Sequence, residues 1–112
     1  MTVDTDRLQE EIMTPNEYQK LAAKTAVYPE CGAIEYLVMG LASEAGEVAG
    51  VVKKAIRAGQ QINPDRVCDE LGDVLWYVAE LASRMNLSLE TVMSDNIDKL
   101  SARIARGRIM EQ

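Results

Sequence analysis

Histidine and phenylalanine are absent from this chain of 112 residues, and proline and glycine are few. Without histidine, the protein has no Ser-His-Asp triad, no histidine general base and no histidine-bound zinc. The apolar residues are mainly Ala, Val, Leu, Ile and Met, a mix that favours helices over a sheet. The length suits one domain with a modest core, which packing against another subunit would strengthen.

The chain also lacks the signals of secretion, of a membrane span and of nucleic acid binding. Its first residues, MTVDTDRLQEE, are polar and acidic, unlike a signal peptide, and no run of about 18 apolar residues is present to span a bilayer. The net charge of −6 disfavours nucleic acid polymers and membrane surfaces as partners. Cys31 and Cys68 form no C-x-x-C pair and suit a reducing compartment. We therefore expect a cytoplasmic protein.

Helix start and stop signals predict four helices, over about 15–26, 33–58, 64–85 and 89–107. Thr14-Pro15-Asn16-Glu17 is a capping box with proline at the first helical position. Asn63 and Ser88 are N-caps for the third and fourth helices. Gly59 and Gly107 are expected to end the second and fourth.

The predicted architecture is all-α, a four-helix bundle-like domain over residues 14–107. A polar segment over 1–13 precedes it, and a short tail over 108–112 follows it. The stretch Val74-Leu75-Trp76-Tyr77-Val78-Ala79 is apolar on nearly every side of its helix, so it should be buried on more than one side. In so short a chain, this indicates that the domain oligomerises through its helices.

Two pairs of acids occupy matching positions on the second and third helices. Glu44 and Glu47 form one pair, and Glu70 and Asp73 form the other. The i, i+3 spacing directs both carboxylates of a pair from one helix face. A single such pair is usually a solvated face, but these two share their spacing and both have glycine just before the second acid. Because mid-helix glycine costs about 1 kcal/mol, Gly46 and Gly72 indicate that backbone or ligand approaches closely there.

The two acid pairs also lie at nearly the same height. A short loop makes the helices antiparallel, and at ~1.5 Å per residue Glu47 and Asp73 lie about 18 and about 15 Å from that loop. Four carboxylates converging between the helices repel one another unless a cation neutralises them. All-oxygen ligands favour Mg²⁺, with Mn²⁺ as a substitute. The lack of histidine argues against a ferritin-like di-iron site.

These residues resemble a known family. Gly40-Leu41-Ala42-Ser43-Glu44-Ala45-Gly46-Glu47-Val48, followed by Asp69-Glu70-Leu71-Gly72-Asp73-Val74-Leu75-Trp76-Tyr77, is similar to the E-x-x-E and E-x-x-D segments of the MazG-type, all-alpha nucleoside triphosphate pyrophosphohydrolases. Asn96-Ile97-Asp98-Lys99-Leu100 with Arg103 resembles their N-x-x-K-L-x-x-R segment. Many members have two adjacent acids where this chain has Ser43-Glu44, which leaves open whether one or two ions bind.

The resemblance implies Mg²⁺-dependent hydrolysis between the α and β phosphates of (deoxy)nucleoside triphosphates, which gives a nucleoside monophosphate and pyrophosphate and serves nucleotide-pool house-cleaning. It also implies a homodimer or homotetramer with sites near the subunit interfaces. Related helical proteins act on dUTP, dCTP or phosphoribosyl-ATP, so the base stays open. A second alternative is a non-enzymatic helical interaction module whose acids bind a metal structurally.

The expected ligands of the metal are Glu44, Glu47, Glu70 and Asp73. Since no histidine or serine triad is present, the nucleophile should be water, and we assign Glu47 as the carboxylate that orients or deprotonates it. The expected substrate-binding residues are Lys54, Tyr77, Asn96, Lys99 and Arg103. Each has an alternative: Lys53 in place of Lys54, a core role for Tyr77, and a solvated basic face on the fourth helix. Trp76 is predicted to be core or interface rather than a platform for a base.

Overall fold

The computed structural model describes residues 13–111, with side chains described up to Arg108, and the predicted polar segment falls outside this range except for Met13. The described residues form four helices and no strand. These helices are α2 (Pro15–Lys24), α3 (Ala33–Ala58), α4 (Pro64–Arg84) and α5 (Leu89–Glu111). The prediction of an all-α fold is therefore confirmed. None of these helices is long and apolar enough to cross a membrane.

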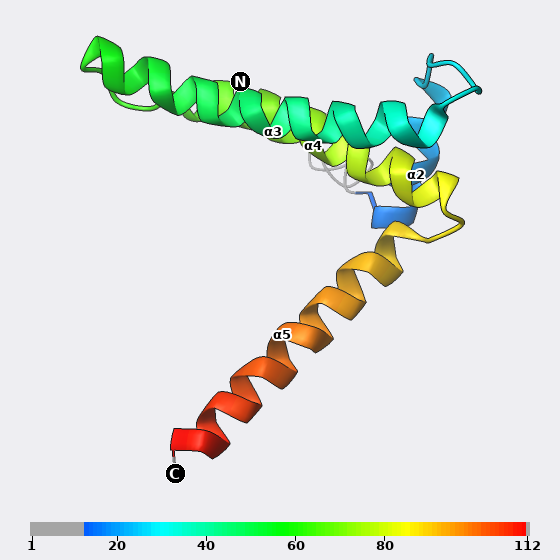
Figure 1. Ribbon diagram of the computed structural model, residues 1–112, viewed down its shortest axis with the longest axis vertical. Coiled ribbons are helices and arrows are strands. Elements are labelled where there is room, and N and C mark those ends of the chain that lie inside the picture. Colours follow the sequence, from blue (N-terminus) through cyan, green and yellow to red (C-terminus); the bar gives the residue numbers. More distant parts are fainter. Residues whose placement is uncertain (1–12, 112) are drawn as a thin grey trace, which may run out of the picture.

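The two long helices α3 and α4 form an antiparallel hairpin that makes up most of the molecule (Figure 1). Gly59 ends α3 in the left-handed region at φ 65°, which glycine adopts without strain. The side chain of Asn63 starts α4 by accepting a hydrogen bond of 2.9 Å from the backbone N–H of Asp65. The predicted end of α3 at Gly59 and the predicted start of α4 after Asn63 are confirmed, because local capping chemistry sets both.

The short helix α2 packs against α4 near the open end of the hairpin. Thr14 caps α2 by accepting a hydrogen bond from the Glu17 N–H at 3.1 Å, as the capping box predicts. A small core forms where α2, α4 and the start of α5 meet. Its buried members are Ala22, Ala79 and Leu89, with Tyr18, Trp76 and Val78 packed against them.

Helix α5 is attached to the rest of the chain only at its first turns. Gln19 of α2 accepts a hydrogen bond from the Leu89 N–H at 2.8 Å and donates to the Leu87 carbonyl at 2.9 Å. Beyond this anchor α5 diverges from the hairpin, and its C-terminal end projects away from α3 and α4 (Figure 1). In the described part of the chain, α5 packs against α2 and α4 but not against α3.

Two expectations for α5 have different outcomes. Ser88 caps the helix as predicted, since its Oγ accepts a hydrogen bond from the Thr91 N–H at 3.0 Å. The predicted end at Gly107 is wrong, because the helix continues to Glu111. A single glycine costs a helix only about 1 kcal/mol, and without a left-handed turn it does not end one.

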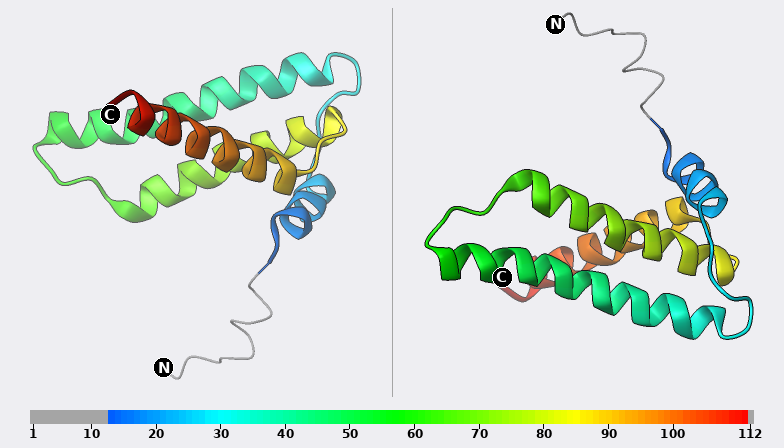
Figure 2. Two further views of the ribbon diagram at one scale, coloured as in Figure 1. Left: turned by 90° about the horizontal axis from the view of Figure 1, so that it is seen from below. Right: turned by 90° about the horizontal axis from the view of Figure 1, so that it is seen from above.

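A row of apolar side chains on α5 is left uncovered within this chain. The α5 stripe consists of Met93, Ile97, Leu100 and Ile104, which are between 41% and 61% exposed. On α4, Leu71 and Leu75 are also about half exposed, at 52% and 44%. The two views in Figure 2 show α5 crossing the hairpin at an angle rather than lying in it as a parallel fourth member. The chain therefore presents apolar surface on two helices.

Candidate metal centre

Three of the four predicted acids come together between α3 and α4. Glu44, Glu70 and Asp73 each offer a carboxylate oxygen, and these oxygens all lie within 4.8 Å of one another. Glu44 and Glu70 are half-buried, whereas Asp73 is exposed. Three hard oxygen ligands at this spacing, open on one side to solvent, suit a divalent cation that keeps some of its water. We call these three residues the acid cluster.

Glu47 lies outside the acid cluster, although it is one turn from Glu44 on the same helix. Its side chain is exposed, and its charge still reaches Glu44. The structure thus divides the predicted quartet into three converging carboxylates and a fourth at their edge. Its role as a ligand stays a prediction.

The electrostatics of the acid cluster are those of crowded like charges. The pKa of Glu44 is raised above its ordinary value, first by partial burial and then by the negative charges of Asp73, Glu70 and Glu47. Crowded carboxylates in this position oppose folding unless a proton or a cation compensates them. A divalent cation would relieve the repulsion at all of these groups at once.

A hollow of about 300 Å³ adjoins the acid cluster and is lined by Glu44, Asp73, Trp76 and Tyr77. The hydroxyl of Tyr36 on α3 lies close to that of Tyr77. Partial burial, the neighbouring Tyr36 hydroxyl and the nearby carboxylates of Glu44 and Asp73 all raise the pKa of Tyr77. Its hydroxyl is therefore protonated at neutral pH and is available as a polar group beside the acids.

Trp76 contributes both to the core and to this hollow. Its ring packs against the buried core, and its indole N–H donates a hydrogen bond of 2.8 Å to Thr25 Oγ1. The Trp76 and Tyr77 rings meet edge to face, with centroids 5.0 Å apart. The predicted core role of Trp76 is confirmed, and the same side chain forms one wall of the hollow.

The glycines near the acids have different surroundings from those predicted. No protein atom lies within 4 Å of a Cβ built on Gly46 or Gly72, so backbone approach within the chain does not explain either residue. Close approach occurs instead at Gly40, one turn before Glu44, where a Cβ would overlap the Tyr77 ring. Tyr77 packs directly on the backbone of α3 at that point. The open space at Gly46 and Gly72 would admit a ligand or another chain.

The remaining predicted binding residues lie away from the acid cluster. Lys54 lines a separate hollow of about 470 Å³ near the tip of the hairpin, together with Arg57 and Arg66. Asn96, Lys99 and Arg103 are exposed on α5, which diverges from the hairpin. The fold of one chain therefore brings Tyr77 to the acids but does not bring the α5 residues there.

Sequence reasoning missed Tyr36 and Gly40 as parts of this site. Gly40 precedes Glu44 by four residues and so lies on the face of α3 that carries the acid. A mid-helix glycine on the face of α3 that carries Glu44 was the available signal. Tyr36 gave no signal of its own, since its contact with Tyr77 depends on how closely α3 and α4 approach.

These features define the class of the protein: an all-helical chain whose central antiparallel hairpin presents converging carboxylates suited to a divalent cation. Residues 33–106 match the MazG nucleotide pyrophosphohydrolase domain, and the chain belongs to this family. The resemblance inferred from the acid motifs is thereby confirmed.

One curated relative supports the match over most of the chain. The "Gene 37 protein" of Mycobacterium phage L5 is 46% identical over 102 residues, which cover 82% of this chain and 90% of that protein. Its name states no activity, so the functional argument rests on the family and on the site. No solved structure matches the chain.

Two glycine substitutions should have opposite effects on stability. We expect Gly40→Ala to lower the free energy of unfolding by about 1–3 kcal/mol, because the new methyl group displaces the Tyr77 ring. Gly72→Ala should raise it by up to about 1 kcal/mol, because alanine is the better helix former and nothing blocks the methyl group. Urea denaturation measures both. A destabilising Gly72→Ala would show that another chain or a ligand fills the space that is open within the single chain.

The acid cluster should respond to divalent cations. We expect Mg²⁺ or Mn²⁺ at about 100 times its Kd to stabilise the fold by about 2.7 kcal/mol, read as a rise in Tm. Asp73→Asn should raise the Tm without metal, because it removes one repelling charge, and should weaken the response to metal. Asp98→Asn, an exposed acid on α5, is the matched control and should change neither value. An unchanged metal response in Asp73→Asn would place the ion elsewhere.

Proposed function

We propose that this chain hydrolyses (deoxy)nucleoside triphosphates between the α and β phosphates, with Mg²⁺ as cofactor, to give a nucleoside monophosphate and pyrophosphate. The observation that carries this proposal is the convergence of Glu44, Glu70 and Asp73 within 4.8 Å in a member of the MazG family. A triphosphate is polyanionic and would be repelled by these acids alone. A divalent cation between acids and phosphates reconciles the acidic site with an anionic substrate.

Glu44, Glu70 and Asp73 would hold the ion, and Glu47 would complete the set from the edge of the cluster. The ion would neutralise charge on the phosphates and polarise the bond that breaks. Glu47, which is exposed and one turn from Glu44, would accept a proton from the attacking water. Tyr77 is protonated beside the acids and can donate a hydrogen bond to a phosphate oxygen.

The basic residues of α5 support a proposal about assembly. Asn96, Lys99 and Arg103 do not reach the acid cluster of their own chain, yet a polyphosphate needs positive groups around its outer oxygens. The α5 stripe is uncovered, and α4 carries an apolar hollow of about 660 Å³ that is lined by residues including Val67, Leu71 and Leu75. We infer a homodimer or homotetramer in which a second copy covers these surfaces and its α5 contributes the basic residues.

Hydrolysis is tested by incubating the protein with Mg²⁺ and each common nucleoside triphosphate, and identifying products by ³¹P NMR. We expect pyrophosphate and a nucleoside monophosphate as the first products. Glu47→Gln and Asp73→Asn should each lower kcat by about 10²–10⁴-fold, while helicity and oligomer size persist. Orthophosphate as the first product would rule out cleavage between the α and β phosphates.

The same assay separates the alternatives for the substrate. A strong preference for dUTP, dCTP or phosphoribosyl-ATP would identify a specialised enzyme with the same site, whereas broad turnover of damaged nucleotides would identify a house-cleaning role. If the unmodified protein turns over none of them but still binds metal, the protein is a metal-binding helical interaction module instead.

The proposed assembly predicts opposite outcomes for two charged substitutions on α5. Ile97 is 61% exposed on the α5 stripe, and we expect Ile97→Asp to convert the oligomer to a monomer, because it would bury a charge at the interface. Ala102 lies on the opposite face of the same helix, so Ala102→Asp makes the same charge change and should leave the oligomer intact. Sedimentation velocity measures both. A monomeric unmodified protein would refute the assembly.

A further inference from the structure

The loop between α2 and α3, residues 25–32, is fastened to α4 at three places. Its partners on α4 are spaced four residues apart, so they form one row along the helix. The hydrogen-bonded pairs are Thr25 with Trp76 at 2.8 Å, Tyr28 with Glu80 at 2.7 Å, and Glu30 with Arg84 at 2.7 Å. The loop therefore runs along the same helix that carries Asp73 and Tyr77.

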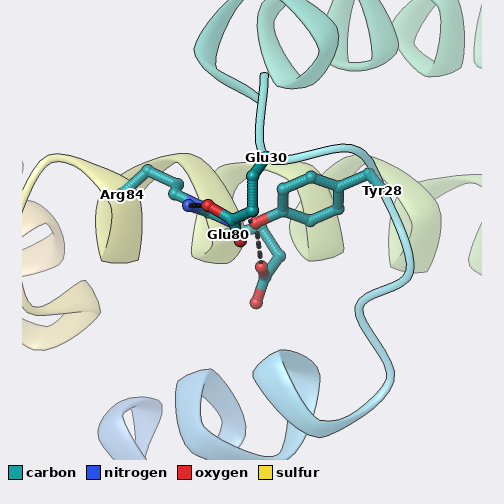
Figure 3. A network of polar contacts seen from close by, with 4 residues as sticks. All are labelled: Tyr28, Glu30, Glu80 and Arg84. Atoms are coloured by element: carbon teal, nitrogen blue, oxygen red, sulfur yellow. Dashed lines mark hydrogen bonds and ion pairs between the residues drawn. The ribbon is translucent and has the colours of Figure 1, made fainter. Parts of the chain in front are cut away.

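The middle pair is the buried one. The Tyr28 hydroxyl donates to Glu80 Oε2 and accepts a hydrogen bond of 3.0 Å from Arg84 Nε (Figure 3). Glu80 is only 3% exposed, and its Oε1 has no hydrogen-bond partner in the described structure. Tyr28 thus provides the one hydrogen bond that the described residues give this carboxylate. The guanidinium of Arg84 also donates two hydrogen bonds of 2.7 Å to the exposed carboxylate of Glu30.

The ring of Tyr28 connects this buried network to the site. It stacks on Tyr36, with centroids 5.6 Å apart and planes 16° apart, and it meets the Trp76 ring edge to face at 6.3 Å. Trp76 in turn meets the Tyr77 ring edge to face, with centroids 5.0 Å apart. Trp76, which Tyr28 contacts, and Tyr77, which Tyr28 reaches through Trp76, form the aromatic wall of the hollow beside Glu44 and Asp73.

We propose that Tyr28 is a positioning residue that holds the aromatic wall, Trp76 and Tyr77, against the acid cluster and thereby sets the affinity for substrate. It contacts neither the acids nor the hollow, so it has no part in the reaction itself. Its hydroxyl, fixed between Glu80 and Arg84, locks the plane of its ring, and the ring fixes Tyr36 and Trp76. The proposal rests on the proposed function in one respect, that the hollow receives the nucleotide.

The test removes the hydroxyl and keeps the ring. Tyr28→Phe should raise KM roughly 3- to 10-fold, the scale of one hydrogen bond, and leave kcat within about twofold. Trp76 is the single tryptophan, so its fluorescence emission, excited where tyrosine does not absorb, reports on the wall without any substrate. The emission spectrum should change in Tyr28→Phe. Val27→Thr in the same loop is the matched control, because Val27 is 92% exposed, and it should change nothing.

A second pair of variants separates positioning from stability. Tyr28→Phe leaves Glu80 buried without its hydrogen bond and lowers the Tm, whereas Tyr28→Phe with Glu80→Met also removes the buried charge and should recover the Tm. We expect the double variant to keep the raised KM and the altered spectra. Glu80→Gln retains an acceptor for the Tyr28 hydroxyl and should behave like the unmodified protein.

The outcomes also separate this proposal from the proposed function. A double variant with recovered Tm, unmodified KM and unmodified spectra would show that Tyr28 only stabilises the fold, and would overturn the proposal. If the unmodified protein hydrolyses no nucleotide, the proposed function fails. The spectra alone then test whether Tyr28 positions the aromatic wall. Spectra of Tyr28→Phe that match those of Val27→Thr would overturn the positioning role, and spectra that differ from them would support it.

Discussion

Mutual repulsion among the carboxylates of Glu44, Glu70 and Asp73 is the constraint around which the rest of the site is arranged. Oxygens of all three lie within 4.8 Å of one another, and the pKa of Glu44 is raised first by partial burial and then by the charges of its neighbours. The antiparallel packing of α3 and α4 imposes the arrangement. The favourable packing of the hairpin must therefore outweigh the repulsion in the absence of a cation, and the fold holds the three acids in an arrangement that suits one.

Near the acids, one aromatic contact shows how closely the two helices of the hairpin pack. The Tyr77 ring packs on the backbone of α3 at Gly40, where even one methyl group would overlap it. From there the aromatic contacts continue through Trp76 and Tyr28 to the buried carboxylate of Glu80. The acid cluster, the adjoining hollow and the loop over residues 25–32 thus belong to one connected set of contacts, which is the basis of the role proposed for Tyr28.

The single chain leaves two parts of the expected function incomplete. Helix α5 carries basic residues that a polyphosphate requires, but it diverges from the hairpin, and its apolar stripe remains exposed. Exposed apolar surface on this scale is typical of a chain that buries it against another. In the proposed assembly, packing between subunits would cover the stripe and would also bring basic groups to the acids.

Local chemistry in the sequence determined the helices, the hairpin and the identity of the family. Capping residues such as Thr14, Asn63 and Ser88 set helix starts through contacts within one turn, so they could be read without the fold. The spacing of the acids likewise placed Glu44, Glu70 and Asp73 on facing surfaces. Only the tertiary structure showed that Glu47 lies at the edge, that close approach occurs at Gly40 rather than at Gly46 or Gly72, and that Tyr28 contacts Tyr36 and Trp76. These features depend on the distance and rotation between packed helices, which periodicity along one chain does not encode.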